Sequence, residues 1–313
     1  MIRVLTLILA IGFSTQVFAA APKETSSFIP VSKSLSLFVK HEPAVAGKST
    51  IVILNGLTHT TENWNTFLKH FKREGHGILQ IDLAGQGETL AKNGAVFHII
   101  RHQDQAAYIS RVIKNLNIRS KVVVLGLSYG GGIATYFAEK FPQMVSKLII
   151  LAPYTEPQPE QDKWIKDQIT NTRIAFPYNT ATDDELYDYF LKQLVYSVYP
   201  AAEPDLLRIP YKLEAVFRMC QGVRRLYTAK HSATLPPNSV HLVGGGSDQL
   251  VKPEVLDRFW SALPVASKAS RLIIKSTDHD LIMLQPKIVA GWVQKILAND
   301  PQTLGGKVSE VAP

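Results

Sequence analysis

Short runs of apolar residues alternate along the chain with longer stretches in which apolar residues recur at helical spacing. The runs predict strands at residues 34–39, 50–54, 76–83, 121–127, 147–151, 239–243 and 271–275. The stretches between them predict helices at residues 61–74, 103–116, 130–141, 253–262 and 287–297. A continuous apolar run is typical of a strand buried on both faces, and strands that alternate with helices indicate βαβ units. The chain is therefore predicted to be an α/β protein, with a mainly parallel sheet and helices on both faces.

The alternation stops over residues 155–235, where helical stretches separated by prolines replace the strands. We therefore expect a discontinuous core, residues 21–154 and 236–313, interrupted by a helical cap at 155–235. In an open parallel sheet, ligands bind beyond the carboxyl ends of the strands. The insertion leaves at such an end and returns before the next strand, so we expect it to cover the site.

The two ends of the chain differ from the rest. Residues 1–20 have the pattern of a secretory signal peptide: Arg3, then a short apolar region, then small residues at Val17 and Ala19 before a cleavage site,. This region is too short to span a bilayer, which needs about 20 apolar residues, and no later segment predicts a membrane span. The protein is therefore predicted to be exported, to a periplasm or to the outside. The Gly- and Pro-containing tail from Asn299 is expected to be mobile.

Composition narrows the function classes. Of 313 residues, 46% are hydrophobic and 19% charged, which excludes a disordered, collagen-like or coiled-coil chain. The single cysteine, Cys220, excludes an intrachain disulfide and a Cys-based zinc site,. The net charge of +8 favours contact with anionic surfaces such as a membrane,. The basic residues are spread out, however, and no nucleic-acid recognition motif is present, so we expect a solvated basic surface and no nucleic-acid partner. No metal-ligand cluster or dinucleotide fingerprint predicts a metal or cofactor.

The motif with most chemical content is Gly126-Leu127-Ser128-Tyr129-Gly130, a match to G-x-S-x-G. It lies between an apolar strand and the start of a helix. A turn this sharp imposes strained backbone angles on Ser128 and leaves no room for side chains two residues before and after it, where the glycines stand. The alternative is a glycine-rich packing turn with an incidental serine.

With this motif in this context, the chain resembles the α/β-hydrolase fold family over about residues 34–297, with the insertion where the family carries its cap. The family's triad runs nucleophile, acid, histidine. The resemblance implies His279, in the loop after the last predicted strand, as the histidine, although Asp278 stands where Gly is frequent. It implies Asp248, after the strand at 239–243, as the acid. Asp278 and Asp280 are expected to be solvated loop carboxylates.

The same resemblance implies an oxyanion hole made of two backbone N–H groups. One belongs to Tyr129, the residue after the nucleophile. The other belongs to Leu57, in the loop that begins Asn55-Gly56 where the family often has His-Gly. His59 lies nearby and is expected to be a surface histidine. The segment Asp82 to Glu88 matches the family's Asp-x-x-Gly-x-Gly-Ser loop except at its last residue, and we interpret it as a structural turn.

These features predict a serine hydrolase that cleaves a small-molecule or lipid ester, for example a lysophospholipid, with peripheral membrane contact. Aromatic residues of the cap either pack it onto the core or line an acyl pocket. One alternative is an amide-cleaving, aminopeptidase-like enzyme that holds a peptide amino terminus with acids such as Glu156, Glu160 or Glu185. Another is a non-catalytic binding protein on the same scaffold. Oligomeric state and natural substrate stay open.

Overall fold

The fold is built on one nine-stranded sheet in the order β1-β2-β4-β3-β5-β6-β7-β8-β9. The computed structural model describes residues 23–96, 98–202, 210–228 and 235–313, and the predicted leader lies outside them. The strands are β1 (Thr25–Pro30), β2 (Ser36–Glu42), β3 (Thr50–Leu54), β4 (Gly77–Asp82), β5 (Val122–Leu127), β6 (Val145–Leu151), β7 (Val240–Gly245), β8 (Lys268–Ile274) and β9 (Lys307–Val311). β1 and β2 join the sheet antiparallel, and all pairings from β4 to β9 are parallel. The predicted α/β class is confirmed.

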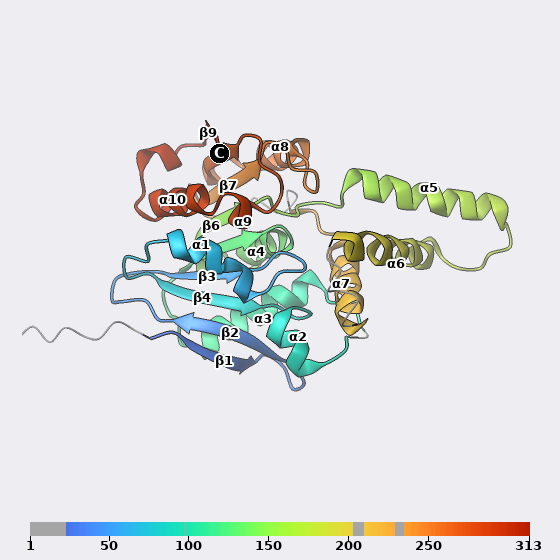
Figure 1. Cartoon of the computed structure of the whole chain (residues 1–313), viewed down its shortest axis with the longest axis horizontal. Coiled ribbons are helices and arrows are strands. Elements are labelled where there is room, and N and C mark those ends of the chain that lie inside the picture. Colours follow the sequence, from blue (N-terminus) through green and yellow to red (C-terminus); the bar gives the residue numbers. More distant parts are fainter. Residues whose placement is uncertain (1–22, 97, 203–209, 229–234) are drawn as a thin grey trace, which may run out of the picture.

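Helices cover both faces of the sheet (Figure 1). The helices of the core are α1 (Asn65–His70), α2 (Gly87–Asn93), α3 (His102–Asn115), α4 (Tyr129–Lys140), α8 (Pro253–Ala262), α9 (Leu281–Leu284) and α10 (Pro286–Leu297). Helices α3, α4 and α8 bury their apolar sides in one cluster against the sheet, and α1, α9 and α10 in a second cluster on the other face. The central strands are fully buried along their length, for example β3 and β5. This burial on both faces explains why these strands appear in the sequence as continuous apolar runs.

The segment between β6 and β7 forms three further helices: α5 (Pro159–Ala175), α6 (Asp183–Ala202) and α7 (Pro210–Val223). Figure 1 shows them at one end of the sheet, outside the two helix layers, with α5 and α6 side by side as a projecting hairpin. Trp164 of α5 packs edge-on against Phe190 of α6, and α7 contacts α3 of the core.

Three expectations from the pattern are corrected. The tail is ordered rather than mobile, because β9 pairs with β8 from Lys307 to Val311 and extends the sheet. Pro200, one of the prolines expected to separate helical stretches, lies inside α6; it removes one backbone hydrogen bond of the helix, which ends two residues later at Ala202,. The predicted helix at 61–74 is shorter, a 3₁₀ turn at Thr61–Trp64 followed by α1. β1 and α2 were not predicted at all.

Candidate active site

The turn between β5 and α4 holds Ser128 in an unusual backbone conformation. Its φ of 52° and ψ of −115° lie outside the helical and extended regions. A Cβ on Gly126 would come within 2.4 Å of the Gly130 carbonyl oxygen, and one on Gly130 within 2.5 Å of the Leu54 carbonyl oxygen. Only glycine fits at either position. The turn is fixed further by the Ser128 N–H, which donates to Leu151 O at 2.8 Å, and by Tyr154 N–H, which donates to Ser128 O at 2.9 Å.

The two other residues singled out in the sequence are brought together by neighbouring strands. The loops after β7 and β8 place His279 Nδ1 2.8 Å from Asp248 Oδ2. Asp248 is 1% exposed, and its second oxygen, Oδ1, accepts the N–H groups of Leu250 at 2.8 Å and Val251 at 2.7 Å. A buried carboxylate with both oxygens occupied is a fixed acceptor. It therefore orients the His279 ring with Nε2 directed away from the carboxylate.

Asp278 is exposed, as expected of a solvated loop carboxylate, and it also joins two loops. Its Oδ1 accepts the N–H of Gln249 at 2.9 Å and the N–H of His279 at 2.8 Å. Ser247 N–H also donates to Thr277 O at 3.0 Å. The loop that carries Asp248 and the loop that carries His279 are thus joined by backbone and carboxylate contacts beside the Asp248–His279 pair. The contact of Asp278 with Gln249 was not predicted, because the two residues are 29 positions apart in sequence.

The loop after β3 is held close to Ser128 by buried amides. Asn55 donates to Asp82 Oδ1 at 3.0 Å and accepts the indole N–H of Trp64 at 3.0 Å. Gln86 donates to Gly56 O at 2.6 Å. Asp82 also accepts the Thr61 N–H at 2.8 Å; burial raises the pKa of its carboxyl. The turn from Asp82 to Glu88 is therefore structural, and it supports the loop that carries Leu57.

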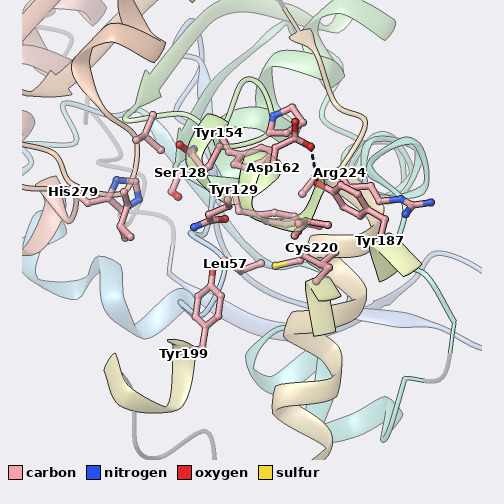
Figure 2. Close-up of a pocket in the computed structure, with 18 residues that line it drawn as sticks. Leu57, Ser128, Tyr129, Tyr154, Asp162, Tyr187, Tyr199, Cys220, Arg224 and His279 are labelled. Atoms are coloured by element: carbon pink, nitrogen blue, oxygen red, sulfur yellow. Dashed lines mark hydrogen bonds between the residues drawn. The ribbon is translucent and has the colours of Figure 1, made fainter. Parts of the chain in front are cut away.

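Ser128, His279, Leu57 and Tyr129 line one cavity beside helices α5–α7 (Figure 2). The Tyr129 N–H is in the first turn of α4, where the helix itself provides no acceptor,. A first lobe of about 100 Å³ extends from Ser128 toward Tyr154, Asp162, Tyr187 and Arg224. A second lobe of about 370 Å³ also contains Ser128 and His279, and extends along α6.

The other downstream and nearby histidines differ in position. His59 lines the second lobe together with Ser128 and His279, and its Nε2 is 3.5 Å from Asp280 Oδ2. His241 is inside β7, where its Nδ1 is 2.9 Å from Ser270 Oγ and burial lowers the pKa of the imidazole to about 3. His231 lies outside the described residues.

The described parts of the chain contain neither a metal-ligand cluster nor a candidate membrane-spanning helix. No three His, Cys, Asp or Glu side chains of residues 23–96, 98–202, 210–228 and 235–313 are grouped to hold a metal ion. Over these same ranges, none of the helices combines the length and the apolar character required to cross a membrane.

The cap aromatics divide into two groups. Tyr187 and Tyr199 line the cavity, whereas others are exposed on the helices or at the tip of the α5–α6 hairpin: Trp164, Phe176, Tyr178, Tyr189 and Tyr196. The wall of the larger lobe is instead mainly aliphatic, made by residues of α6: Leu191, Leu194, Val195 and Val198.

Comparison with known proteins gives the family and the fold. The family model described as "Serine aminopeptidase, S33" matches residues 46–283. A protein of Haemophilus influenzae named as an esterase/lipase is 29% identical over 290 residues, which cover 87% of this chain and 92% of that protein. A 2-hydroxy-6-oxononadienedioate/2-hydroxy-6-oxononatrienedioate hydrolase of Pseudomonas putida is 25% identical over 139 residues, 42% of this chain. The match covers 47% of that enzyme, so this chain spans about half of its length.

Among solved structures, an α/β hydrolase from a deep-sea metagenome library of the Medee basin superposes with a TM-score of 0.64 at 17% identity. It covers 88% of this chain and 98% of its own. The naproxen esterase of Bacillus subtilis gives a TM-score of 0.57 at 19% identity over 88% of this chain and 92% of that enzyme. At these identities the likeness concerns the fold.

Proposed function

Since the chain belongs to the S33 serine aminopeptidase family of α/β hydrolases, we propose that it cleaves carboxylic esters, with Ser128 as nucleophile, His279 as base and Asp248 as the acid. The observation that carries this proposal is the 2.8 Å contact between His279 and the buried Asp248, in loops that place His279 in the same cavity as Ser128. The strained turn at Ser128 supports it, because such strain at a nucleophile is part of how the hydroxyl is presented.

In the proposed reaction the Ser128 hydroxyl oxygen attacks the ester carbonyl carbon while His279 Nε2 takes the hydroxyl proton. The negative charge on the carbonyl oxygen is stabilised by the N–H groups of Leu57 and Tyr129. As the C–O bond breaks, the imidazolium returns the proton to the leaving alcohol, and an acyl-Ser128 remains. Water then attacks the acyl group, again with His279 as base, and the acid is released. Asp248 stabilises the imidazolium at both steps.

An ester is favoured over a peptide amino terminus by the charges of the cap. Glu156 pairs with Arg258 at 2.5 Å, and Glu160 pairs with Lys252 at 2.5 Å. Glu185 accepts the Thr182 N–H at 2.7 Å at the start of α6. Each of the acids considered for binding an ammonium group is thus engaged elsewhere, and none lines either lobe. The family description names an aminopeptidase, so amide cleavage is the second candidate.

The test is labelling by a fluorophosphonate probe together with turnover of matched substrates. We expect the wild type to be labelled, Ser128→Ala to be unlabelled and to lose about 10⁶ in kcat, and the variant to keep the wild-type circular dichroism spectrum. Hydrolysis of an ester but not of the matched anilide supports the ester assignment, and the reverse supports the amide. A wild-type protein without labelling or turnover would indicate the binding-protein alternative.

We also propose export and a peripheral contact with lipid, as supported by the signal-peptide pattern of residues 1–20 and the net charge of +8. Expression of the full chain in a bacterium, followed by fractionation and N-terminal mass spectrometry, tests this. We expect the mature protein outside the cytoplasm, beginning after Ala19 or Ala20. An intact Met1 in the cytoplasm would contradict it.

A further inference from the structure

The two lobes of the cavity share their entrance at the reactive serine but differ in chemistry beyond it. Eight residues line both: Leu57, Ser128, Gln161, Leu191, Tyr199, Cys220, Leu250 and His279. A bound ester with its carbonyl carbon at Ser128 would therefore place one substituent in each lobe. The lobes differ in the side chains beyond these, and the shared Leu191 continues the aliphatic wall of the larger lobe.

The larger lobe, of about 370 Å³, is lined on one side by residues of α6 that recur along one face of the helix. Leu191, Leu194, Val195 and Val198 stand at helical spacing, so they form one stripe on this helix,. None of these four side chains carries a polar atom. An aliphatic chain fits such a wall, because it buries apolar surface without leaving a hydrogen-bonding group unpaired.

The smaller lobe, of about 100 Å³, ends in hydrogen-bonding groups. The Tyr187 hydroxyl donates to Asp162 Oδ1 at 3.0 Å, and Figure 2 shows this pair at the end of the cavity away from His279, with Tyr154 beside it. Having donated its proton, the Tyr187 oxygen can still accept a hydrogen bond. This lobe is smaller than the other, so it accepts the shorter of the two substituents.

The charges at this end are already balanced. Lys166 Nζ lies 2.5 Å from Asp162 Oδ2. Arg224 Nη1 lies 2.7 Å from Asp188 Oδ1, and its guanidinium lies over the Tyr187 ring at 5.3 Å. A substrate cation would compete with Lys166, and a substrate anion would compete with Asp188. A neutral hydroxyl suits the lobe better than either.

We propose that the substrate is an ester in which an aliphatic chain is joined to a short, uncharged, hydroxyl-bearing group, and that Tyr187 with Asp162 recognises the hydroxyl. This inference rests on the proposed ester hydrolysis and specifies its substrate class. The hydroxyl can be on the alcohol or on the acid of the ester, and the two sources are separated by the substrates below.

The experiment compares two matched pairs of esters. One pair is the glycerol monoester of octanoic acid and propyl octanoate; the other is octyl glycerate and octyl propanoate. We expect the wild type to favour the hydroxylated member of at least one pair by about tenfold in kcat/KM, the effect of one well-placed hydrogen bond. In Tyr187→Phe this ratio should fall to near one. Tyr189→Phe removes an exposed hydroxyl from the same helix, 58% exposed and outside both lobes, and should keep the wild-type ratio.

A preference in the glycerol pair places the hydroxyl on the alcohol, and one in the glycerate pair places it on the acid. An active enzyme with no preference in either pair, or a preference that survives in Tyr187→Phe, overturns the inference while the proposed function stands. A protein that neither cleaves p-nitrophenyl acetate nor reacts with a fluorophosphonate overturns the proposed function, and this inference with it. A circular dichroism spectrum and a melting temperature equal to those of the wild type show that Tyr187→Phe is folded.

Discussion

Ser128 and Asp248 each have an unusual local feature, one in the backbone and one in the packing. A non-glycine residue with φ near 50° costs on the order of 1–3 kcal/mol, and glycines on either side of Ser128 allow β5 and α4 to approach. The Asp248 carboxyl group is buried, and three hydrogen bonds compensate for the lost water,. Both features belong to residues for which we propose a catalytic role.

Asp248→Asn should lower kcat by about 10⁴, because an amide group at this position leaves the His279 ring in the wrong tautomer. The backbone contacts of Oδ1 with Leu250 and Val251 can persist in the variant, so we expect the melting temperature to change little. Steady-state kinetics on p-nitrophenyl acetate and thermal unfolding measure the two effects. If Asp248→Asn has nearly the wild-type kcat, the acid of the triad is a carboxylate in another loop.

Two substitutions at Asp278 test whether its carboxylate positions the loops that carry Gln249 and His279. Asp278→Ala removes the acceptor shared by Gln249 and His279, so we expect kcat to fall about tenfold, while the KM for a small ester stays within a factor of two. Asp278→Asn keeps a carbonyl oxygen at the same place and should restore most of the activity. The discriminating measurement is kcat of the two variants at one pH, because both substitutions remove the same negative charge and only Asp278→Asn keeps an acceptor oxygen. Equal losses in both variants would contradict a positioning role.

The residues that we propose for the site could be singled out in the sequence because each follows a recognisable strand. The G-x-S-x-G turn pointed to Ser128, and the loops after two apolar runs pointed to Asp248 and His279. The residues that hold these loops could not be found in this way. Asn55, Gln86 and Asp278 form hydrogen bonds with partners 26 to 30 residues away, for example Ile81 for Asn55 and Gly56 for Gln86. Contacts of this kind depend on tertiary structure and leave no periodic signal.

Among the elements, buried strands were predicted well and edge strands poorly. β3 to β8 are shielded on both faces and therefore appear as apolar runs,. β1 and β9 lie at the two edges and are half exposed, so their sequences resemble loops. β9 forms because its backbone pairs with β8, a contact that composition does not reveal. The Gly- and Pro-containing tail was consequently interpreted as mobile.

If the ester binds as we propose, α6 is the element expected to limit the length of its aliphatic chain. Leu194→Trp adds an indole to the aliphatic wall of the larger lobe and should reduce the space available to a long chain. We expect kcat/KM for p-nitrophenyl octanoate to fall at least tenfold, and for p-nitrophenyl acetate to stay within threefold. Tyr189→Trp, on the exposed side of the same helix, is the matched control and should leave both values unchanged. If Leu194→Trp lowers both esters equally, the lobe does not hold the chain.

At the scale of the whole molecule, the free energy of unfolding depends on pH through titratable groups that folding buries. His241 is one such group, and burial lowers the pKa of its imidazole to about 3. The unfolded chain therefore binds a proton at this residue below about pH 6.5, whereas the folded chain binds it only near pH 3,. Stability contributed by this residue is therefore lost as the pH falls through that window. Glu139, on α4, has the opposite sign.

Burial raises the pKa of Glu139 to about 8, whereas an unfolded glutamate loses its proton near pH 4.3. The folded state therefore holds a proton that the unfolded state has released, and the free energy of unfolding falls as the pH rises from about 4.5 through 8. Glu139→Gln keeps a neutral side chain of the same shape at every pH. We expect urea unfolding to show the variant more stable than the wild type at pH 8.5, by on the order of 2–4 kcal/mol, with most of this difference absent at pH 4.5.

The matched control is Glu254→Gln, which removes an exposed carboxylate from α8 and changes the net charge by the same amount. It separates the effect of burial at Glu139 from the effect of overall charge on a basic protein. A constant difference between Glu139→Gln and the wild type at both pH values would mean that Glu139 is ionised in the folded state. Burial of this side chain, which is 8% exposed, would then not be what sets its protonation state.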